Sequence, residues 1–273
     1  VDSCNQDGTL REWYCGELGD PAGLLRSENF VSCPTDSSCL EGICSKEHKM
    51  AIVLVNFQDS PPQPFTPAEA QDLIFNSQFQ NFYNEQSYGR IHFTGDVFGW
   101  FTLQRNGVGE CWVSLGWEGE LDPYIINNGI DLSNYDHLIT IFSKPPGCPG
   151  IWAGSIGPLN LPINGQTYLI SIAFITTEGT EIYALNHEIG HNLGAAHANG
   201  YDCNDQTLGS SCQHIEYGNY FDTMGGRLYA SQFNSMYKEK LEFVLPQEIL
   251  IIDQPGTYTI NALETPGGKK FAK

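Results

Sequence analysis

The chain has 273 residues and is 41% hydrophobic, which is enough to bury a core and excludes wholesale disorder. Its 32 acidic and 13 basic residues give a formal net charge of −19, which disfavours nucleic acid and anionic membranes as partners. No stretch approaches the roughly 18 consecutive apolar residues that a membrane-spanning helix requires.

Cysteines are concentrated at the start of the chain. Five of the nine fall in the first 44 residues, at Cys4, Cys15, Cys33, Cys39 and Cys44. Their irregular spacing does not match paired Cys-x-x-Cys zinc motifs, so we predict disulfides formed in an oxidising compartment. Residues 1–47 are therefore expected to form a Cys-rich N-terminal segment, either a stapled extension or a pro-segment. We expect a secreted protein whose signal peptide has been removed.

Strands and helices alternate through the first two thirds of the chain. Met50–Phe57 is a short apolar run typical of a buried strand. Thr66-Pro-Ala-Glu69 is a helix start, and apolar residues extend that helix to about Tyr88. The further expected elements are a strand or hairpin at 91–103, a helix at 116–128, and strands at 137–142, 151–159 and 168–175. This alternation predicts an α/β sheet.

The last third of the chain has less regular patterning. Residues 181–193 are expected to form a helix, and 198–226 are polar, rich in Gly, Asn and Asp, and expected to be mostly irregular. Another helix is expected at 231–243. Short strands at 249–252 and 257–260 predict that a further β module begins within 251–273.

A motif for metal binding lies in the helix expected at 181–193. The sequence is His187-Glu188-Ile-Gly-His191-Asn-Leu-Gly194-Ala-Ala-His197. His187 and His191 are four residues apart and share one helix face, and Gly194 allows a sharp turn that brings His197 to them. Three neutral imidazoles suit Zn²⁺ and leave a fourth position for water, as in a catalytic site. The alternative is three unrelated capping or core histidines.

This pattern resembles the signature of the metzincin metalloproteases, H-E-x-x-H-x-x-G-x-x-H. The resemblance implies a twisted, mostly parallel sheet with an active-site helix and an irregular C-terminal subdomain. The catalytic domain would span 48–250, with an upper subdomain at 48–197 and a lower one at 198–250. It also implies a methionine turn below the metal, for which Met224 is the candidate and Met236 the rival. A gluzincin would need a downstream Glu ligand in place of His197.

Within the metzincins the chain looks like the gametolysin family. The similar segments are 185–198, 216–225 and 233–241, with looser likeness at 50–57 and 83–100. Two positions depart from related subfamilies. Position 198 is Ala where several subfamilies have an acid, and position 226 is Gly, so the Tyr ligand of astacins and serralysins is missing.

The resemblance also implies a function, a zinc endopeptidase in which Glu188 transfers protons and Met224 supports the site. An extended protein or peptide substrate would pair with a free strand edge, for which Trp152, Gly154 and Ile156 in segment 151–157 are candidates. An ordinary sheet strand is an equally good interpretation of that segment. His214 and Tyr217 lie where a pocket wall is expected, although a solvated loop is favoured for both. The protein is expected to be a monomer.

Two other functions remain open on sequence alone. One is a binding protein on an inactive protease scaffold, against which the retained Glu188 argues. The other is a zinc hydrolase of a different amide, such as peptidoglycan. A calcium ion is compatible with the many carboxylates, but the chain has no Asp-x-Asp-x-Asp-Gly loop to support one.

The odd number of cysteines leaves at least one thiol without an intrachain partner. Tyr14-Cys15-Gly16-Glu-Leu-Gly-Asp20 loosely resembles the latency peptide of matrix metalloproteases, in which a thiolate blocks the metal. The spacing to the Asp is one residue too long. The simpler hypothesis is that Cys15 forms a disulfide. Cys203 and Cys212 are close enough to pair, as are Cys111 and Cys148.

Overall fold

We describe the protein from a computed structural model. The described residues are 3–6, 9–15, 25–31, 33–59, 63–107, 119–145, 147–148, 150–177, 182–207, 209, 211–226 and 232–273. For residues 11–15, 25–31 and 177 only the backbone is described.

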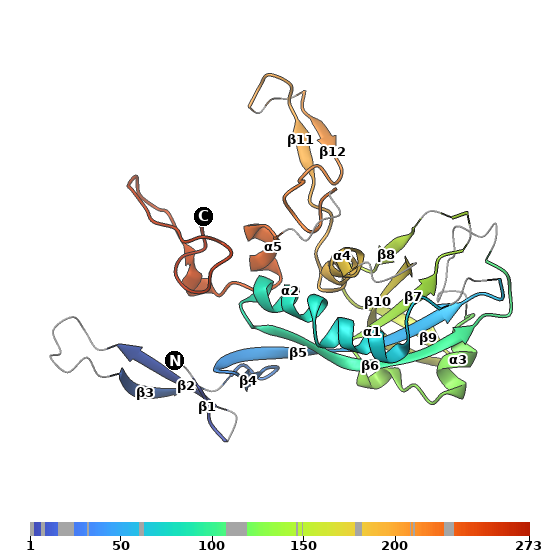
Figure 1. Ribbon diagram of the computed structural model, residues 1–273. Coiled ribbons are helices and arrows are strands. Elements are labelled where there is room, and N and C mark those ends of the chain that lie inside the picture. The colour runs from blue at the N-terminus through green and yellow to red at the C-terminus, as the bar shows by residue number, and fades with distance from the viewer. Residues whose placement is uncertain are drawn as a thin grey trace.

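A seven-stranded, mostly parallel sheet forms the centre of the protein (Figure 1). Strands β5, β7 and β10 run parallel to one another, and β6 pairs in parallel with β5. The shorter strands β8 and β9 pair antiparallel with β10, and β4 pairs antiparallel with β5. The strands are β4 (Ser38–Leu40), β5 (Ile43–Asn56), β6 (Ile91–Thr102), β7 (His137–Ser143), β8 (Trp152–Gly154), β9 (Leu159–Ile163) and β10 (Gln166–Thr177).

The central strand β5 is buried on both faces, which explains its uninterrupted apolar run. Met50, Ile52 and Leu54 belong to one core cluster. The alternate residues Ala51, Val53 and Val55 belong to a second cluster on the opposite face. Because successive strand residues point to opposite faces, this run requires apolar layers on both sides of the sheet.

Helices cover both faces of this sheet. Helix α1 (Pro67–Phe75) begins as expected, with a capping box between Thr66 and Glu69. The single helix expected up to Tyr88 is interrupted, and α2 (Gln78–Ser87) starts after the non-helical Ser77. Helices α1 and α2 pack on β6, and α4 (Ile182–Asn192) packs on β10. Helix α3 (Asp122–Asn127) and the 3₁₀ helix η1 (Leu132–Asn134) contribute to the second core cluster.

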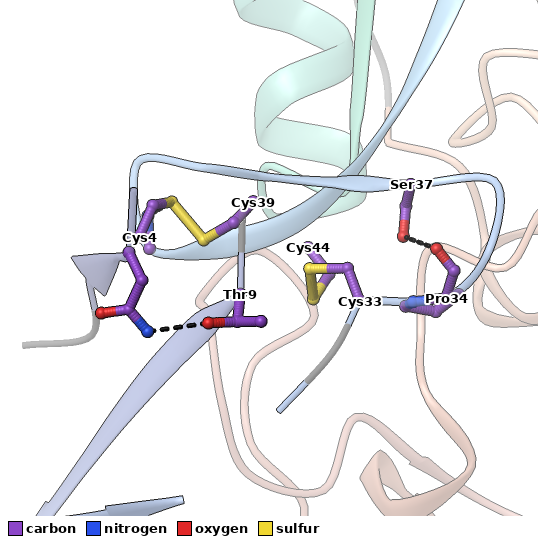
Figure 2. Close-up of a disulfide and its surroundings, with 9 residues drawn as sticks. Cys4, Thr9, Cys33, Pro34, Ser37, Cys39 and Cys44 are labelled. Carbon is purple, nitrogen blue, oxygen red and sulfur yellow. Dashed lines mark hydrogen bonds between the residues drawn. A yellow bond between two sulfur atoms is a disulfide. The ribbon is translucent and has the colours of Figure 1, made fainter. Parts of the chain in front are cut away.

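The N-terminal part forms a separate three-stranded antiparallel sheet. Its strands are β1 (Ser3–Cys4), β2 (Leu10–Cys15) and β3 (Leu25–Val31). The disulfides Cys4–Cys39 and Cys33–Cys44 connect this part to β4 and β5 (Figure 2). The expected domain boundary between residues 47 and 48 falls inside β5.

The region after α4 contains little regular structure. It comprises β11 (Gly200–Asp202), β12 (Gln213–Ile215), α5 (Ser235–Lys240) and η2 (Pro246–Glu248). The β11–β12 hairpin stands away from the central sheet (Figure 1) and is closed by the disulfide Cys203–Cys212. At the C-terminal end β13 (Ile249–Leu250) pairs in parallel with β14 (Phe271–Ala272). Residues 257–260, expected as a strand, are irregular and mostly exposed.

The predicted fold class, an α/β arrangement with a curled, mostly parallel sheet, is confirmed. Within the described residues, no helix combines the length and the apolar character that crossing a membrane demands.

Candidate metal centre

Helix α4 carries the central part of the motif and is fixed to its surroundings by polar contacts. The buried Tyr83 hydroxyl donates a hydrogen bond of 2.7 Å to the Asn186 carbonyl. At the other end of α4, Asn192 Nδ2 donates to the carbonyls of Ser155, at 3.1 Å, and Ile172, at 2.8 Å. The helix is therefore tied both to α2 and to the edge of the sheet.

The turn after α4 brings the third histidine to the other two. Gly194 has a φ of 113°, a conformation that residues with a Cβ rarely adopt. The candidate ligand atoms of His187, His191 and His197 all lie within 4.8 Å of one another. In the described part of the chain, no second group of three His, Cys, Asp or Glu residues is arranged to hold a metal ion.

Each histidine has its Nδ1 atom hydrogen-bonded outside the cluster. His187 Nδ1 lies 2.8 Å from the Thr223 carbonyl, and His191 Nδ1 lies 2.8 Å from the Ala195 carbonyl. His197 Nδ1 lies 2.7 Å from Glu216 Oε1. Carbonyl and carboxylate oxygens only accept, so Nδ1 carries the proton in each ring. The three Nε2 lone pairs are thereby free for a metal ion, and the residues fit a zinc site.

Burial disfavours the charged forms of His187, His191 and Glu188. Desolvation lowers the pKa of His191 to about 4 and also lowers the pKa of His187. Desolvation raises the pKa of Glu188 to about 8. Glu188 is only 4% exposed, and its Oε2 has no hydrogen-bond partner among the described residues. An unpartnered buried oxygen of this kind can form a hydrogen bond with a molecule in the site.

Met224 lies directly beneath α4. It is fully buried, and a Cβ placed on Gly190 would come within 2.4 Å of its sulfur. The Met224 carbonyl accepts a 2.8 Å hydrogen bond from Ala198 N. The rival Met236 lies on α5 and is 61% exposed. Met224 is thus the methionine in contact with the metal-binding helix.

The candidate edge strand lies beside Glu188. Trp152 and Gly154 belong to β8, and a Cβ on Gly154 would lie 3.1 Å from Glu188 Oε2. Ile156 follows the strand and is strongly exposed. Trp152 also packs edge-on against Tyr183, with ring centroids 5.6 Å apart. Together with Glu188 and His187, these two rings line a cleft of about 440 Å³.

Sequence reasoning missed Glu216 near the histidines and gave Tyr217 a place in the pocket wall only as the less favoured of two interpretations. Glu216 was not singled out, and it supplies a carboxylate to His197 from the loop after β12. Tyr217 was interpreted as part of a solvated loop, yet its ring centroid lies 3.8 Å from that of His197. His214, by contrast, is exposed on the β11–β12 hairpin, where its ring contacts Tyr201.

The remaining cysteine predictions are only partly covered by the described residues. Cys203 and Cys212 are paired as expected. Cys148 is disulfide-bonded. Cys111 and the Cys15 side chain lie outside what the structure describes, so the latency hypothesis stays a prediction.

With this geometry in place, comparison with known proteins defines the class. A family model described as metallo-peptidase family M12 matches residues 32–231, so the chain belongs to this family. The predicted metallopeptidase class is confirmed, whereas the gametolysin likeness stays a prediction.

More distant similarity exists among solved structures. Metalloproteinase-II from Bacteroides fragilis is 16% identical, with a TM-score of 0.38, covering 77% of this chain and 55% of that one. A chain in a structure of a chaperone–substrate complex is 16% identical, with a TM-score of 0.34, covering 80% of this chain and 34% of that one. The chain therefore spans about half the length of metalloproteinase-II and about a third of the length of the chain in the chaperone–substrate complex. No curated protein sequence matches it.

Proposed function

We propose that the chain is a secreted zinc endopeptidase that hydrolyses peptide bonds of extracellular proteins, with Glu188 as the general base. One observation carries the proposal. Three histidines present free Nε2 atoms next to a buried carboxylate whose Oε2 has no partner among the described residues. Membership of a metallo-peptidase family agrees with this chemistry. Within that family we favour a gametolysin-like enzyme, on the segments that resemble that group.

His187, His191 and His197 would hold the zinc ion. When bound, zinc supplies Lewis acidity towards a water molecule and towards the scissile carbonyl. The hydrogen bonds from Nδ1 to Thr223, Ala195 and Glu216 hold the three imidazoles in the tautomer and orientation that this role requires.

Glu188 moves the proton in the proposed reaction. Its free Oε2 takes a proton from the attacking water and passes it to the nitrogen of the leaving amine. Burial alone raises its pKa to about 8, and a zinc ion held by the three histidines would favour the carboxylate form that accepts the proton. Met224 touches no reacting atom in this scheme and supports α4 from below.

The substrate is proposed to be an extended peptide that adds a strand to β8. In the described part of the chain β8 pairs only with β10, so its other edge is open. Backbone hydrogen bonds along Trp152–Gly154 and onward to Ile156 would hold the peptide beside Glu188. The disulfides of the N-terminal part and of the hairpin support an extracellular location.

Replacement of Glu188 tests the function. We expect Glu188→Ala to bind zinc as the wild type does, by elemental analysis, while casein or gelatin digestion falls at least about a hundredfold. Chelation of the wild type should abolish digestion, and zinc should restore it. Glu69→Ala, at the start of the distant helix α1, is the matched control.

Three results would contradict the proposal in different ways. Loss of zinc from Glu188→Ala would make this residue a ligand. Residual digestion near the wild-type rate would remove Glu188 from the mechanism. A wild type that releases no peptides would favour the inactive scaffold or a different amide substrate, such as peptidoglycan.

A further inference from the structure

The cleft beside the histidines combines aromatic rings with carboxylates. Its volume is about 440 Å³, and no lysine or arginine is among its described lining residues. A cavity with aromatic faces and negative charge favours a cation over a neutral group. The rings belong to Trp152, Tyr183, Tyr217 and Tyr220, and the carboxylates to Glu188 and Glu216.

The wall formed by Tyr217 and Tyr220 is held in place by backbone contacts. Tyr217 N donates a 3.1 Å hydrogen bond to Asn199 Oδ1, and its carbonyl accepts one of 2.8 Å from Gly226 N. A Cβ on Gly226 would lie 3.2 Å from Tyr220 Cε1 and 2.9 Å from the Tyr217 carbonyl. The Tyr217 backbone is therefore fixed before any ligand arrives, and its ring lies against that of His197 with centroids 3.8 Å apart, which lowers the entropy lost on binding.

Glu216 is the carboxylate that a ligand side chain can reach. One of its oxygens accepts the hydrogen bond from His197, while the side chain as a whole is 62% exposed. No basic side chain among the described residues pairs with it, since its one ion-pair contact is with His197. A neutral apolar group placed over this carboxylate would remove water from it without supplying a hydrogen bond, which is unfavourable.

We propose that the cleft binds a lysine or arginine side chain of the substrate next to the scissile bond. Glu216 pairs with its charge, and the Tyr217 and Tyr220 rings contact its cation and its aliphatic stem. This inference rests on the proposed peptidase function. The overall charge of −19 also favours the approach of basic peptides over acidic ones.

Matched peptides test the preference. A quenched fluorescent peptide is made in four versions, with Arg, Lys, Gln or Leu at the residue after the scissile bond, and again at the residue before it. At one of the two positions we expect kcat/KM for Arg and Lys to exceed that for Gln and Leu by about tenfold or more. In Glu216→Gln this ratio should fall to about one.

The ratio of kcat/KM for the basic peptides to kcat/KM for the neutral peptides separates substrate specificity from metal binding. Glu216→Gln retains an oxygen that can accept from His197, and any loss of zinc lowers kcat/KM for all four peptides equally. Asp205→Asn removes one negative charge from the exposed hairpin without touching the cleft and should preserve the preference.

Binding measurements make the outcome independent of catalysis. The same peptides are titrated calorimetrically into zinc-loaded Glu188→Ala, with and without Glu216→Gln. Tighter binding of Arg and Lys peptides that depends on Glu216 supports the inference even if no peptide is cleaved, a result that would reject the peptidase alone. Equal rates and equal affinities across the series, or a preference unchanged by Glu216→Gln, would overturn it.

Discussion

The described residues of the sheet region, within 43–177, and those of the region after helix α4, within 195–244, are stabilised in different ways. The first contains six consecutive residues of β5 that are fully buried, divided between two core clusters. In the second, residues 224–244 join the core of the sheet, but between residues 199 and 223 Cys203 is the only buried apolar residue that the structure describes, and polar contacts hold that segment. The sheet region is thus stabilised mainly by burial of apolar area, and the polar segment after α4 mainly by a small number of specific hydrogen bonds.

A single carboxylate organises much of the second region. Asp222 is fully buried, and its two oxygens accept 2.7 Å hydrogen bonds from Met224 N and Asn234 N. Burial raises its pKa, and these two bonds oppose that rise. Tyr237 completes the arrangement, because its hydroxyl donates to the carbonyls of Ala196, at 2.6 Å, and His197, at 3.0 Å. The position of His197 therefore depends on contacts made by only a few residues.

The largest effect is expected in the core of the sheet. Leu54→Ala should lower the free energy of unfolding by ~2–5 kcal/mol, because it leaves a cavity beneath helices α1 and α2. Urea denaturation measures this loss, with and without chelator. Leu169→Ala, at a 70% exposed position of β10, is the control and should change stability by less than about 1 kcal/mol. Similar losses in the two variants would contradict the description of this core.

The second largest effect is expected from acid, which should lower the free energy of unfolding through the sheet region. His137 is 2% exposed, and desolvation lowers its pKa from 6.5 to about 4. The unfolded chain therefore binds a proton more readily than the folded one between these values, so stability falls as pH drops through this window. His137 alone would contribute roughly 2 kcal/mol of that loss by pH 5.

Denaturation across this pH range measures the effect. His137→Gln should flatten the fall in stability relative to the wild type, because its side chain does not titrate. The three histidines of the candidate metal site are unchanged in both proteins. His214→Gln, on the exposed hairpin, is the control. An unchanged slope in His137→Gln would show that this buried histidine is not responsible.

A smaller effect on overall stability is expected from a substitution in the region after α4. Asp222→Asn leaves one oxygen to accept two hydrogen bonds, so one backbone N–H loses its partner, at a cost of ~1–3 kcal/mol. Hydrogen exchange should show lost protection at residues 196–226 while β5 is unchanged. Asp253→Asn, at an exposed position, is the control. Uniform loss of protection across both regions would show that they unfold as one unit.

The smallest effect is expected from the hairpin disulfide. The Cys203–Cys212 bond closes a short loop on a hairpin that stands away from the sheet (Figure 1). Replacing both residues by Ala should expose the hairpin to proteolysis, yet shift the melting temperature by no more than about 2 °C, because the opening is local. A shift as large as that of Leu54→Ala would mean that the hairpin supports the whole fold.

Local signals in the sequence predicted their elements well. Thr66, Pro67 and Glu69 begin α1 as their residue types require, and the histidine motif brings its three imidazoles together within one helix and one turn. The break at Ser77 was not predicted, because apolar residues continue across it. Its position follows from packing, since Phe79 and Tyr83 join an aromatic cluster with Phe93.

Residues that reach the site over long loops were harder to predict: Glu216 was missed, and Tyr217 was placed in the pocket wall only as the less favoured interpretation. Glu216 and Tyr217 lie some twenty residues after His197, and their path depends on the pairing of β11 with β12. It also depends on the close approach of Gly200 and Gly218, where a Cβ on Gly218 would lie 2.7 Å from Gly200 N. Neither feature produces a periodic pattern in the sequence.

The two hydrogen bonds donated by Asn192 have a mechanical consequence. They join the helix that carries Glu188 to the carbonyls of Ser155 and Ile172, next to and behind β8. These bonds hold helix and strand against each other, so a peptide paired with β8 as proposed would meet Glu188 at a distance set by the protein and not by the peptide's own sequence.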